Sequence, residues 1–285
     1  MSKGFLVVAQ NTSTVDYVKQ AYALALSIKF SQTTYNNISI MTNDPIGDEY
    51  KSVFDQIIAI PWDDAAENAT WKVENRWKVY HITPYEETII LDTDMLLLED
   101  ITKWWLYCSN YDLKFCSKIK NYKLEPVVDN VYRKAFTQNH LQNPYFALHY
   151  FKKSENAYYF YKVLEFVCNN WEWAWSTLAP NNYQNWLSMD LAAAVTIELL
   201  GLQETAVDQI SPLEFIHMKP ALQGWHATPE KWQDVVPAVM NSKGDLVVSN
   251  IKQSKLFHYV EKDFVNEQLL TRLKELANGK TKIQI

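Results

Sequence analysis

The residues with the clearest capacity for chemistry are two aspartates in the segment Ile89-Ile90-Leu91-Asp92-Thr93-Asp94-Met95-Leu96-Leu97-Leu98. Asp92 and Asp94 are two positions apart, so on an extended backbone their carboxylates project to the same side. Ionised carboxylates in so apolar a segment are costly unless hydrogen bonds, cations or a metal compensate them. A hard divalent ion with oxygen ligands, Mg²⁺ or Mn²⁺, would do so. The pattern therefore predicts a metal site, and the alternative is that the two aspartates only cap a turn.

The elements before the aspartates predict where such a site would lie. Residues 88–91 are apolar on both faces, which is typical of a central strand in a parallel sheet. Open α/β sheets bind ligands beyond the carboxyl ends of their strands, where Asp92 and Asp94 stand. Further upstream, the hydrophobic periodicity predicts strands over 4–9, 38–42 and 54–60 and helices over 15–28 and 70–83. This alternation indicates βαβ units and a mainly parallel sheet.

The second half of the chain carries weaker but similar signals. Apolar runs predict strands over 143–151, 215–218 and 256–259, and helices over 154–170 and 190–200. We expect a last helix to begin at Asp263, as its N-cap, and to end at Asn278-Gly279. The stretch 101–142 and the aromatic segment Trp171–Trp175 give no clear assignment.

The composition limits the classes of ligand. The 285 residues carry 27 lysines and arginines against 33 aspartates and glutamates, a net charge of −6, so nucleic acid is not an expected partner. The six glycines are about 2% of the chain, against a usual share of about 7%. None of them forms a G-x-G-x-x-G or P-loop pattern. A bound phosphate would therefore need a metal or cationic side chains for its neutralisation.

Cysteine usage and apolar runs bear on the compartment. Three cysteines, an odd number without a C-x-x-C pair, fit a reducing environment. The apolar stretch 5–9 is too short for a signal-peptide core, and no run approaches the roughly eighteen apolar residues of a membrane span. We expect a cytoplasmic protein with no transmembrane segment.

Several cations and histidines are candidates to join the aspartates. Arg76 and Lys78, on the helix expected before the central strand, could meet phosphates or remain solvated. The neutral imidazole of His258 would complete a metal site without adding charge, and its alternative is a core histidine. His217 competes for that role. With Lys219 in His217-Met218-Lys219-Pro220, it could instead line an acceptor side or touch phosphate.

Three segments together resemble a known family. Arg76-Trp77-Lys78-Val79-Tyr80, Pro84-Tyr85 and then 88–96 resemble the helix–strand–D-x-D passage of GT-A glycosyltransferases. The resemblance is greatest to the family 8-like retaining group that includes glycogenin and bacterial galactosyltransferases. The opening, Val7-Val8-Ala9-Gln10-Asn11-Thr12 with Tyr17, is similar to that group's nucleotide-binding strand and helix, and 257–262 to its late His-Tyr segment. After His258 the chain departs from the pattern, since Lys262-Asp263-Phe264 replaces a glycine and a later Lys-Pro-Trp.

The resemblance implies a fold and a domain organisation. The expected fold is a GT-A-like α/β domain over 1–285, with a mixed, mainly parallel sheet and helices on both faces. Residues 1–100 would form the nucleotide-binding half, and residues 101–285 the acceptor-side half with the C-terminal helix. The implied activity is metal-dependent transfer of a sugar from a nucleotide-diphosphate donor, UDP-sugar favoured, to a glycan or other hydroxyl acceptor, with retention by front-face attack.

The resemblance also implies roles for individual residues. His258 would be the third metal ligand beside Asp92 and Asp94. Asp190, which could otherwise be only a helix N-terminal dipole partner, would lie near the donor sugar and acceptor as a catalytic-site carboxylate. The remaining candidates would bind the donor, the first three through its base and ribose: Ala9, Thr12, Tyr17, Arg76, Lys78, Thr93, His217, Lys219 and Lys262.

Other functions remain open on the sequence. An aspartyl-nucleophile phosphatase also ends an apolar strand in D-x-D, but on its first strand, whereas Asp92 lies far into the chain. A sugar-nucleotide pyrophosphorylase would normally carry a glycine-rich N-terminal loop. A non-catalytic carbohydrate-binding protein could stack Trp171, Trp173 and Trp175 on a glycan, which would leave the buried carboxylates unexplained.

Overall fold

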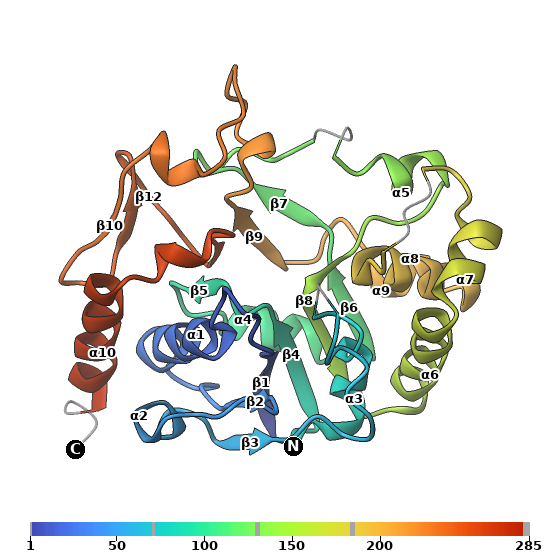
Figure 1. The fold of residues 1–285 in the computed structure, drawn as a ribbon, viewed down its shortest axis with the longest axis horizontal. Coiled ribbons are helices and arrows are strands. Elements are labelled where there is room, and N and C mark those ends of the chain that lie inside the picture. The colour runs from blue at the N-terminus through green and yellow to red at the C-terminus, as the bar shows by residue number, and fades with distance from the viewer. Residues whose placement is uncertain (1, 70–71, 129–131, 183–185, 282–285) are drawn as a thin grey trace.

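A six-stranded mixed sheet runs through the computed structural model, which describes residues 2–69, 72–128, 132–182 and 186–281 (Figure 1). The strand order is β3-β2-β1-β4-β8-β6. The strands are β1 (Lys3–Val8), β2 (Ile38–Met41), β3 (Gln56–Ile58), β4 (Glu87–Leu91), β6 (Leu113–Cys116) and β8 (Tyr145–Lys152). The first four are parallel, and β8 runs antiparallel to both β4 and β6. The expected mixed, mainly parallel sheet is confirmed.

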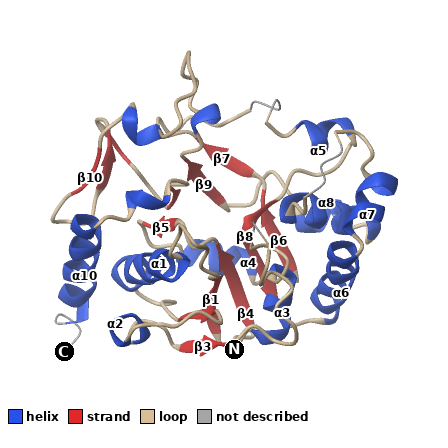
Figure 2. Cartoon of the chain, in the orientation of Figure 1, coloured by secondary structure: helices blue, strands red, loops and turns tan. Residues whose placement is uncertain are grey.

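Helices cover both faces of this sheet, as expected (Figure 2). Phe5 and Ile89 point to one face, where they pack with α1 (Tyr17–Ser31) and α4 (Thr102–Cys108). Their neighbours Leu6 and Ile90 point to the other face, toward α6 (Glu155–Asn169) and α8 (Met189–Leu199). Because successive side chains of a strand alternate between faces, a central strand covered on both sides must be apolar where it is covered, as β1 is over residues 5–8 and β4 over residues 89–91.

A second, four-stranded sheet lies above the first in Figure 1 and carries the late histidines. Its order is β5-β13-β9-β7. Its strands are β5 (Met95–Leu97), β7 (Lys118–Lys120), β9 (Glu214–His217) and β13 (Leu256–His258). β13 pairs antiparallel with β5 and parallel with β9. The chain that leaves β4 is therefore brought beside β13, a strand near the C-terminus.

The remaining elements are short or peripheral. A small antiparallel sheet contains β10 (Ala238–Met240), β11 (Leu246–Val248) and β12 (Ile251–Lys252). The other α-helices are α2 (Asp48–Lys51), α3 (Val79–Ile82), α5 (Lys134–Gln138), α7 (Trp171–Leu178), α9 (Gln203–Ala206) and α10 (Glu267–Thr281). The 3₁₀ helices are η1 (Arg76–Lys78), η2 (Pro220–Leu222), η3 (Trp232–Asp234) and η4 (Lys262–Phe264). Among the described residues, each helix is too short or too polar to cross a membrane.

Two predicted helices differ in the structure. The helix expected over 70–83 is η1 followed by the single turn α3, and Trp71 lies outside the described residues. Asp263 does not cap the last helix, because it lies in η4. The side chain of Asn266 accepts a hydrogen bond from the Leu269 amide at 3.0 Å, and α10 continues past Gly279 to Thr281.

Candidate metal and donor site

Asp92 and Asp94 lie in the turn that joins β4 to β5, at the carboxyl end of the buried strand β4. This turn replaces the extended backbone that the two-residue spacing predicted, because the chain leaves the main sheet here to enter the second one. The amide of Asp92 donates to the Ala147 carbonyl oxygen at 3.1 Å, which ties the turn to β8. The two carboxylates converge through the turn rather than through the pleat of a strand.

His258 joins the aspartates because of the register between β13 and β5. His258 pairs with Met95, and the Tyr259 amide donates to the Asp94 carbonyl oxygen at 3.1 Å. The imidazole Nε2 consequently lies 2.9 Å from Asp94 Oδ2. Asp92, Asp94 and His258 each offer one ligand atom, and these atoms lie within 4.8 Å of one another. Two carboxylate oxygens and one imidazole nitrogen form a donor set that fits Mn²⁺ or Mg²⁺.

Two cations hold the carboxylates in the structure. Arg76 Nη1 donates to Asp92 Oδ1 at 2.6 Å, and Lys262 Nζ donates to Asp94 Oδ2 at 2.5 Å. Burial alone would raise the pKa of the Asp94 carboxyl, but His258 and Lys262 hold that pKa well below its usual range. Burial likewise opposes the charge of Arg76 and of Lys262, yet the adjacent aspartates raise the pKa of both. The site thus combines ionised oxygen ligands with two charged donors that a phosphate could recruit.

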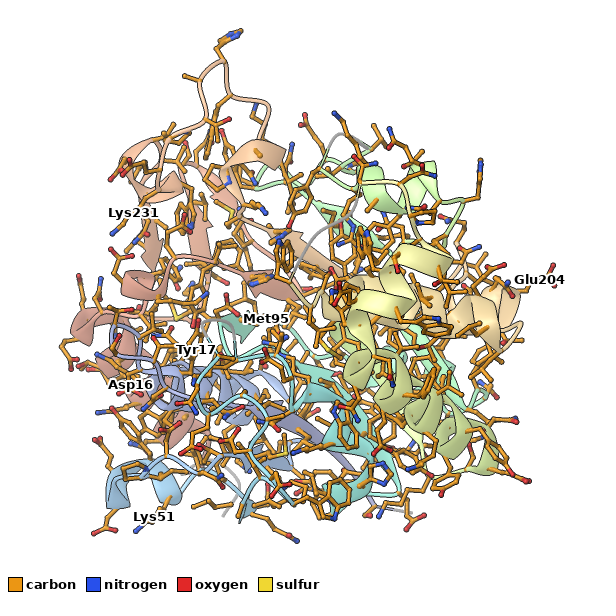
Figure 3. The ribbon with its side chains drawn as sticks, turned by 45° about the vertical axis from the view of Figure 1, so that its right-hand side comes forward. Asp16, Tyr17, Lys51, Met95, Glu204 and Lys231 are labelled. Atoms are coloured by element: carbon orange, nitrogen blue, oxygen red, sulfur yellow. The ribbon has the colours of Figure 1, made fainter. Side chains whose placement is uncertain are left out.

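Tyr17 borders this cluster from the start of α1. Lys262 Nζ lies 5.8 Å from the centroid of its ring, and α1 contacts β5, which begins at Met95 directly after Asp94 (Tyr17 and Met95 are labelled in Figure 3). Burial raises the pKa of the Tyr17 hydroxyl, on which the charges of Lys262 and Asp94 also act. α1 begins here because the Asp16 carboxylate caps it, accepting from the Lys19 amide at 2.9 Å.

The other predicted base and ribose contacts follow β1. Ala9 is fully buried and donates its amide to the Met41 carbonyl oxygen at 3.0 Å. The Thr12 hydroxyl oxygen accepts from the Val15 amide at 3.1 Å, within the turn before α1. Thr93 is buried between the two aspartates. These residues lie at the carboxyl ends of β1 and β4, as do Asp92 and Asp94.

Lys78 is not brought to the cluster. Its buried ammonium donates to the backbone carbonyl oxygens of Pro61, at 3.1 Å, and Asp63. Burial lowers its pKa, and the nearby charges are Asp64, Asp63 and Glu165 rather than Asp92 and Asp94. Arg76, two residues earlier in η1, faces the other way. The expectation that Lys78 meets a donor phosphate is therefore corrected, because its side chain fastens the loop after β3.

His217 lies beside His258 on the neighbouring strand β9, and Lys219 follows two residues later. The His217 ring is buried and stacks on the His258 ring. Among the described residues, the ligand atoms that converge are those of Asp92, Asp94 and His258, without His217. Burial lowers the pKa of His217 well below its ordinary value, and neighbouring His258 lowers it further. Lys219 Nζ lies 3.7 Å from the centroid of the Tyr132 ring and lines a cavity of about 510 Å³.

Asp190 borders the same cavity from the first turn of α8. It does more than face the helix dipole, since its Oδ1 accepts from the Phe146 amide at 2.7 Å. Its Oδ2 accepts from Arg133 Nη1 at 2.5 Å. Arg133 also donates to the Asn143 side chain and the Pro144 carbonyl oxygen, and it lies between the Phe136 and Tyr145 rings. Arg133 belongs to the stretch 101–142 that the sequence left unassigned.

The sequence did not predict the buried polar network that lies at the end of β1. The Asn75 side-chain amide donates to Gln10 Oε1 at 3.0 Å and to Asp64 Oδ1 at 2.5 Å. Gln10 Nε2 donates to the same aspartate at 3.0 Å. The network joins the loops after β1 and β3 to the segment before η1. The polar residues directly after the first strand were its one local signal.

No protein-family model and no curated protein matches the sequence. Solved structures do resemble the fold. The apo glycosyltransferase GlyE of Streptococcus pneumoniae TIGR4 matches with a TM-score of 0.53 and 12% identity, over 100% of this chain but only 64% of GlyE. The galactosyltransferase LgtC, in complex with donor and acceptor sugar analogues, matches with a TM-score of 0.53 and 12% identity, over 96% of this chain and 95% of LgtC. Mouse xyloside xylosyltransferase 1 matches with a TM-score of 0.53 and 10% identity, over 90% and 97%. The expected GT-A-like fold is confirmed.

Proposed function

We propose that this chain is a metal-dependent glycosyltransferase that moves a sugar from a UDP-sugar to a hydroxyl acceptor. One observation carries the proposal: Asp92, Asp94 and His258 converge at the carboxyl end of β4, where α/β sheets bind their ligands. The likeness in fold to glycosyltransferases supports it. The family resemblance of the sequence supports the retaining stereochemistry.

Mn²⁺ or Mg²⁺ would be held by Asp92, Asp94 and His258, and when bound it would stabilise negative charge on the departing diphosphate. Arg76 and Lys262 are already at these carboxylates, so short side-chain rotations would bring them to phosphate oxygens. They would take over the neutralisation that a glycine-rich loop provides elsewhere. Tyr17 and Thr12 would contact the nucleoside, whereas the buried Ala9 and Thr93 would support the backbone beneath it.

In the transfer step, the bond between the anomeric carbon and the β-phosphate oxygen breaks. The acceptor oxygen bonds to that carbon, and its proton passes to the departing diphosphate or to water. Asp190 would stand beside the reacting sugar, with its charge oriented by Arg133 and the Phe146 amide. The cavity that it borders is also lined by Arg76, the partner of Asp92, so the donor and acceptor sides would be contiguous.

The rival functions explain fewer observations. A phosphatase nucleophile would follow the first strand, whereas Asp92 follows β4 and is ion-paired to Arg76. For a carbohydrate-binding platform, the three tryptophans of α7 should share one exposed face. Trp175 is fully buried, with Trp171 packed against it, and Trp173 is about half exposed. They do not form a common flat surface.

A thermal-shift panel of nucleoside diphosphates, with and without Mn²⁺, tests the proposal, because a ligand that binds only the folded state raises its apparent stability. We expect UDP with Mn²⁺ to raise the Tm more than either alone. Release of UDP from UDP-sugars in the presence of Mn²⁺ is the matching activity assay. The proposal fails if no nucleoside diphosphate shifts the Tm and no UDP-sugar is consumed.

A further inference from the structure

The cavity beside Asp190 has an unusual charge balance. Among the described residues that line its roughly 510 Å³, four are cations, Arg76, Arg133, Lys134 and Lys219, and Asp190 is the single carboxylate. The whole chain, by contrast, has a net charge of −6. The described lining of this cavity therefore carries an excess of positive charge, whereas the chain as a whole carries an excess of negative charge.

Two of these four cations are neutralised by carboxylates, and the other two have no such partner among the residues that the structure describes. Arg76 pairs with Asp92, and Arg133 pairs with Asp190. Within the described ranges, Lys134 and Lys219 form no ion pair with a carboxylate. Lys219 is half-buried, and its ammonium lies over the Tyr132 ring. A partly desolvated ammonium without a counter-charge attracts an anion from the solvent side of the cavity.

Aromatic rings line the same cavity as Lys134 and Lys219. Tyr132 and Trp186 line the same cavity and are 38% and 49% exposed. Exposed aromatic faces pack against the apolar faces of sugar rings, while their polar edges remain hydrated. The cavity thus pairs surfaces suited to a sugar ring with cations suited to an anionic substituent.

We propose that the acceptor is an acidic saccharide, one that carries a carboxylate or phosphate group which Lys219 binds, with Lys134 at the rim. This inference rests on the proposed glycosyl transfer and adds the class of its acceptor. The donor diphosphate does not account for these lysines, because Arg76 and Lys262 already stand at the metal cluster. A carboxylate on the donor sugar is the competing source of the anion.

Binding to the protein saturated with UDP and Mn²⁺ tests the acceptor class without turnover. The probes are glucose and galactose, each beside its uronate and its 6-phosphate, titrated by calorimetry or ligand-observed NMR. We expect at least one anionic member to bind about fivefold or more tightly than its neutral parent at low salt. The advantage should shrink at 0.5 M NaCl, where the Debye length is only about 4 Å.

Matched variants locate the effect. Lys219→Met should abolish most of the anion preference, Lys219→Arg should keep it, and Lys103→Met, an exposed lysine of α4, should leave it unchanged. Equal affinity for neutral and anionic sugars overturns the inference. So does a loss of UDP affinity in Lys219→Met, or a Lys219-dependent preference for UDP-glucuronate over UDP-glucose, since both assign the lysine to the donor. Failure of the proposed function itself is recognised separately, by the absence of Mn²⁺-dependent UDP binding.

Discussion

The imidazole rings of His217 and His258 are stacked, with centroids 4.6 Å apart and planes 15° from parallel. The stack follows from the parallel pairing of β9 with β13, in which the two histidines are register partners. His258 alone of the two reaches Asp94, with Nε2 at 2.9 Å from the carboxylate. The neutral His217 ring therefore packs against the imidazole of His258 and restricts its orientation.

This geometry ranks the two histidines as metal ligands. His258→Ala removes a nitrogen ligand, so we expect the affinity for Mn²⁺ to fall at least about tenfold, equivalent to ~1.4 kcal/mol. His217→Ala removes only the supporting ring and should weaken binding less. Titration of Mn²⁺ into both variants, followed by electron paramagnetic resonance, measures the two affinities directly. The reverse ranking would assign the ligand role to His217.

Asp92→Asn tests the carboxylate cluster. The amide keeps the volume and can still accept from Arg76, but it removes one negative charge from the donor set. We expect turnover of UDP-sugar to fall by about 10²-fold or more, with an unchanged circular dichroism spectrum. Asp48→Asn, at an exposed carboxylate in α2, is the matched control and should retain full activity. Near-normal turnover by a folded Asp92→Asn protein would contradict the metal site.

The elements that local signals specify are the ones that the sequence predicted well. β1, β4 and β13 are short apolar runs bounded by polar or turn residues, and α6 has a clear periodicity, so each lies within a few residues of its expected range. Asp92 and Asp94 could be singled out because charge in an apolar run is costly whatever the fold.

The contacts that sequence reasoning missed join residues far apart in the chain. Arg133 and Asp190 are 57 positions apart, and nothing near either residue indicates the other. Lys78 was misplaced for a related reason. Two positions on a helix are about 200° apart, so Lys78 and Arg76 do not share a face. The Lys78 ammonium instead donates to the carbonyl oxygens of Pro61 and Asp63. Tertiary acceptors for a buried cation cannot be deduced from the spacing of the cations themselves.

We expect the protein to lose stability in mild acid because of the buried His149. The ring is fully buried in β8, where its two nitrogens contact the Phe146 carbonyl oxygen and the Tyr161 hydroxyl, each at 2.8 Å. Burial lowers the pKa of His149 from 6.5 to about 3. The unfolded chain therefore binds a proton between these values that the folded chain does not. The contribution of neutral, buried His149 to the free energy of unfolding is fully present above pH 6.5. It is lost as the pH falls toward 3, by about 1.4 kcal/mol per pH unit.

Urea unfolding at pH 7, 6, 5 and 4 measures this slope. His149→Gln retains polar atoms near both partners but does not titrate, so its free energy of unfolding should fall less steeply with acid than that of the unchanged protein. His140→Gln, at an exposed histidine, is the control and should keep the original slope. Parallel pH profiles for the unchanged and His149→Gln proteins would rule out this residue as the source.

The last prediction concerns how the donor diphosphate is held. Because the chain has no glycine-rich phosphate loop, the negative charge must be met at the cluster of Asp92, Asp94 and His258, with Arg76 and Lys262 assisting. UDP offers adjacent phosphate oxygens to the ion and should bind at least about tenfold more tightly than UMP in Mn²⁺. EDTA should remove most of that advantage, since the carboxylates alone repel the phosphates. Calorimetry with UDP, UMP and GDP, each with Mn²⁺ and with EDTA, measures this coupling. Equal UDP affinity in both conditions would refute the metal-bridged mechanism, whereas tighter binding of GDP than UDP would leave the mechanism intact and correct only the base.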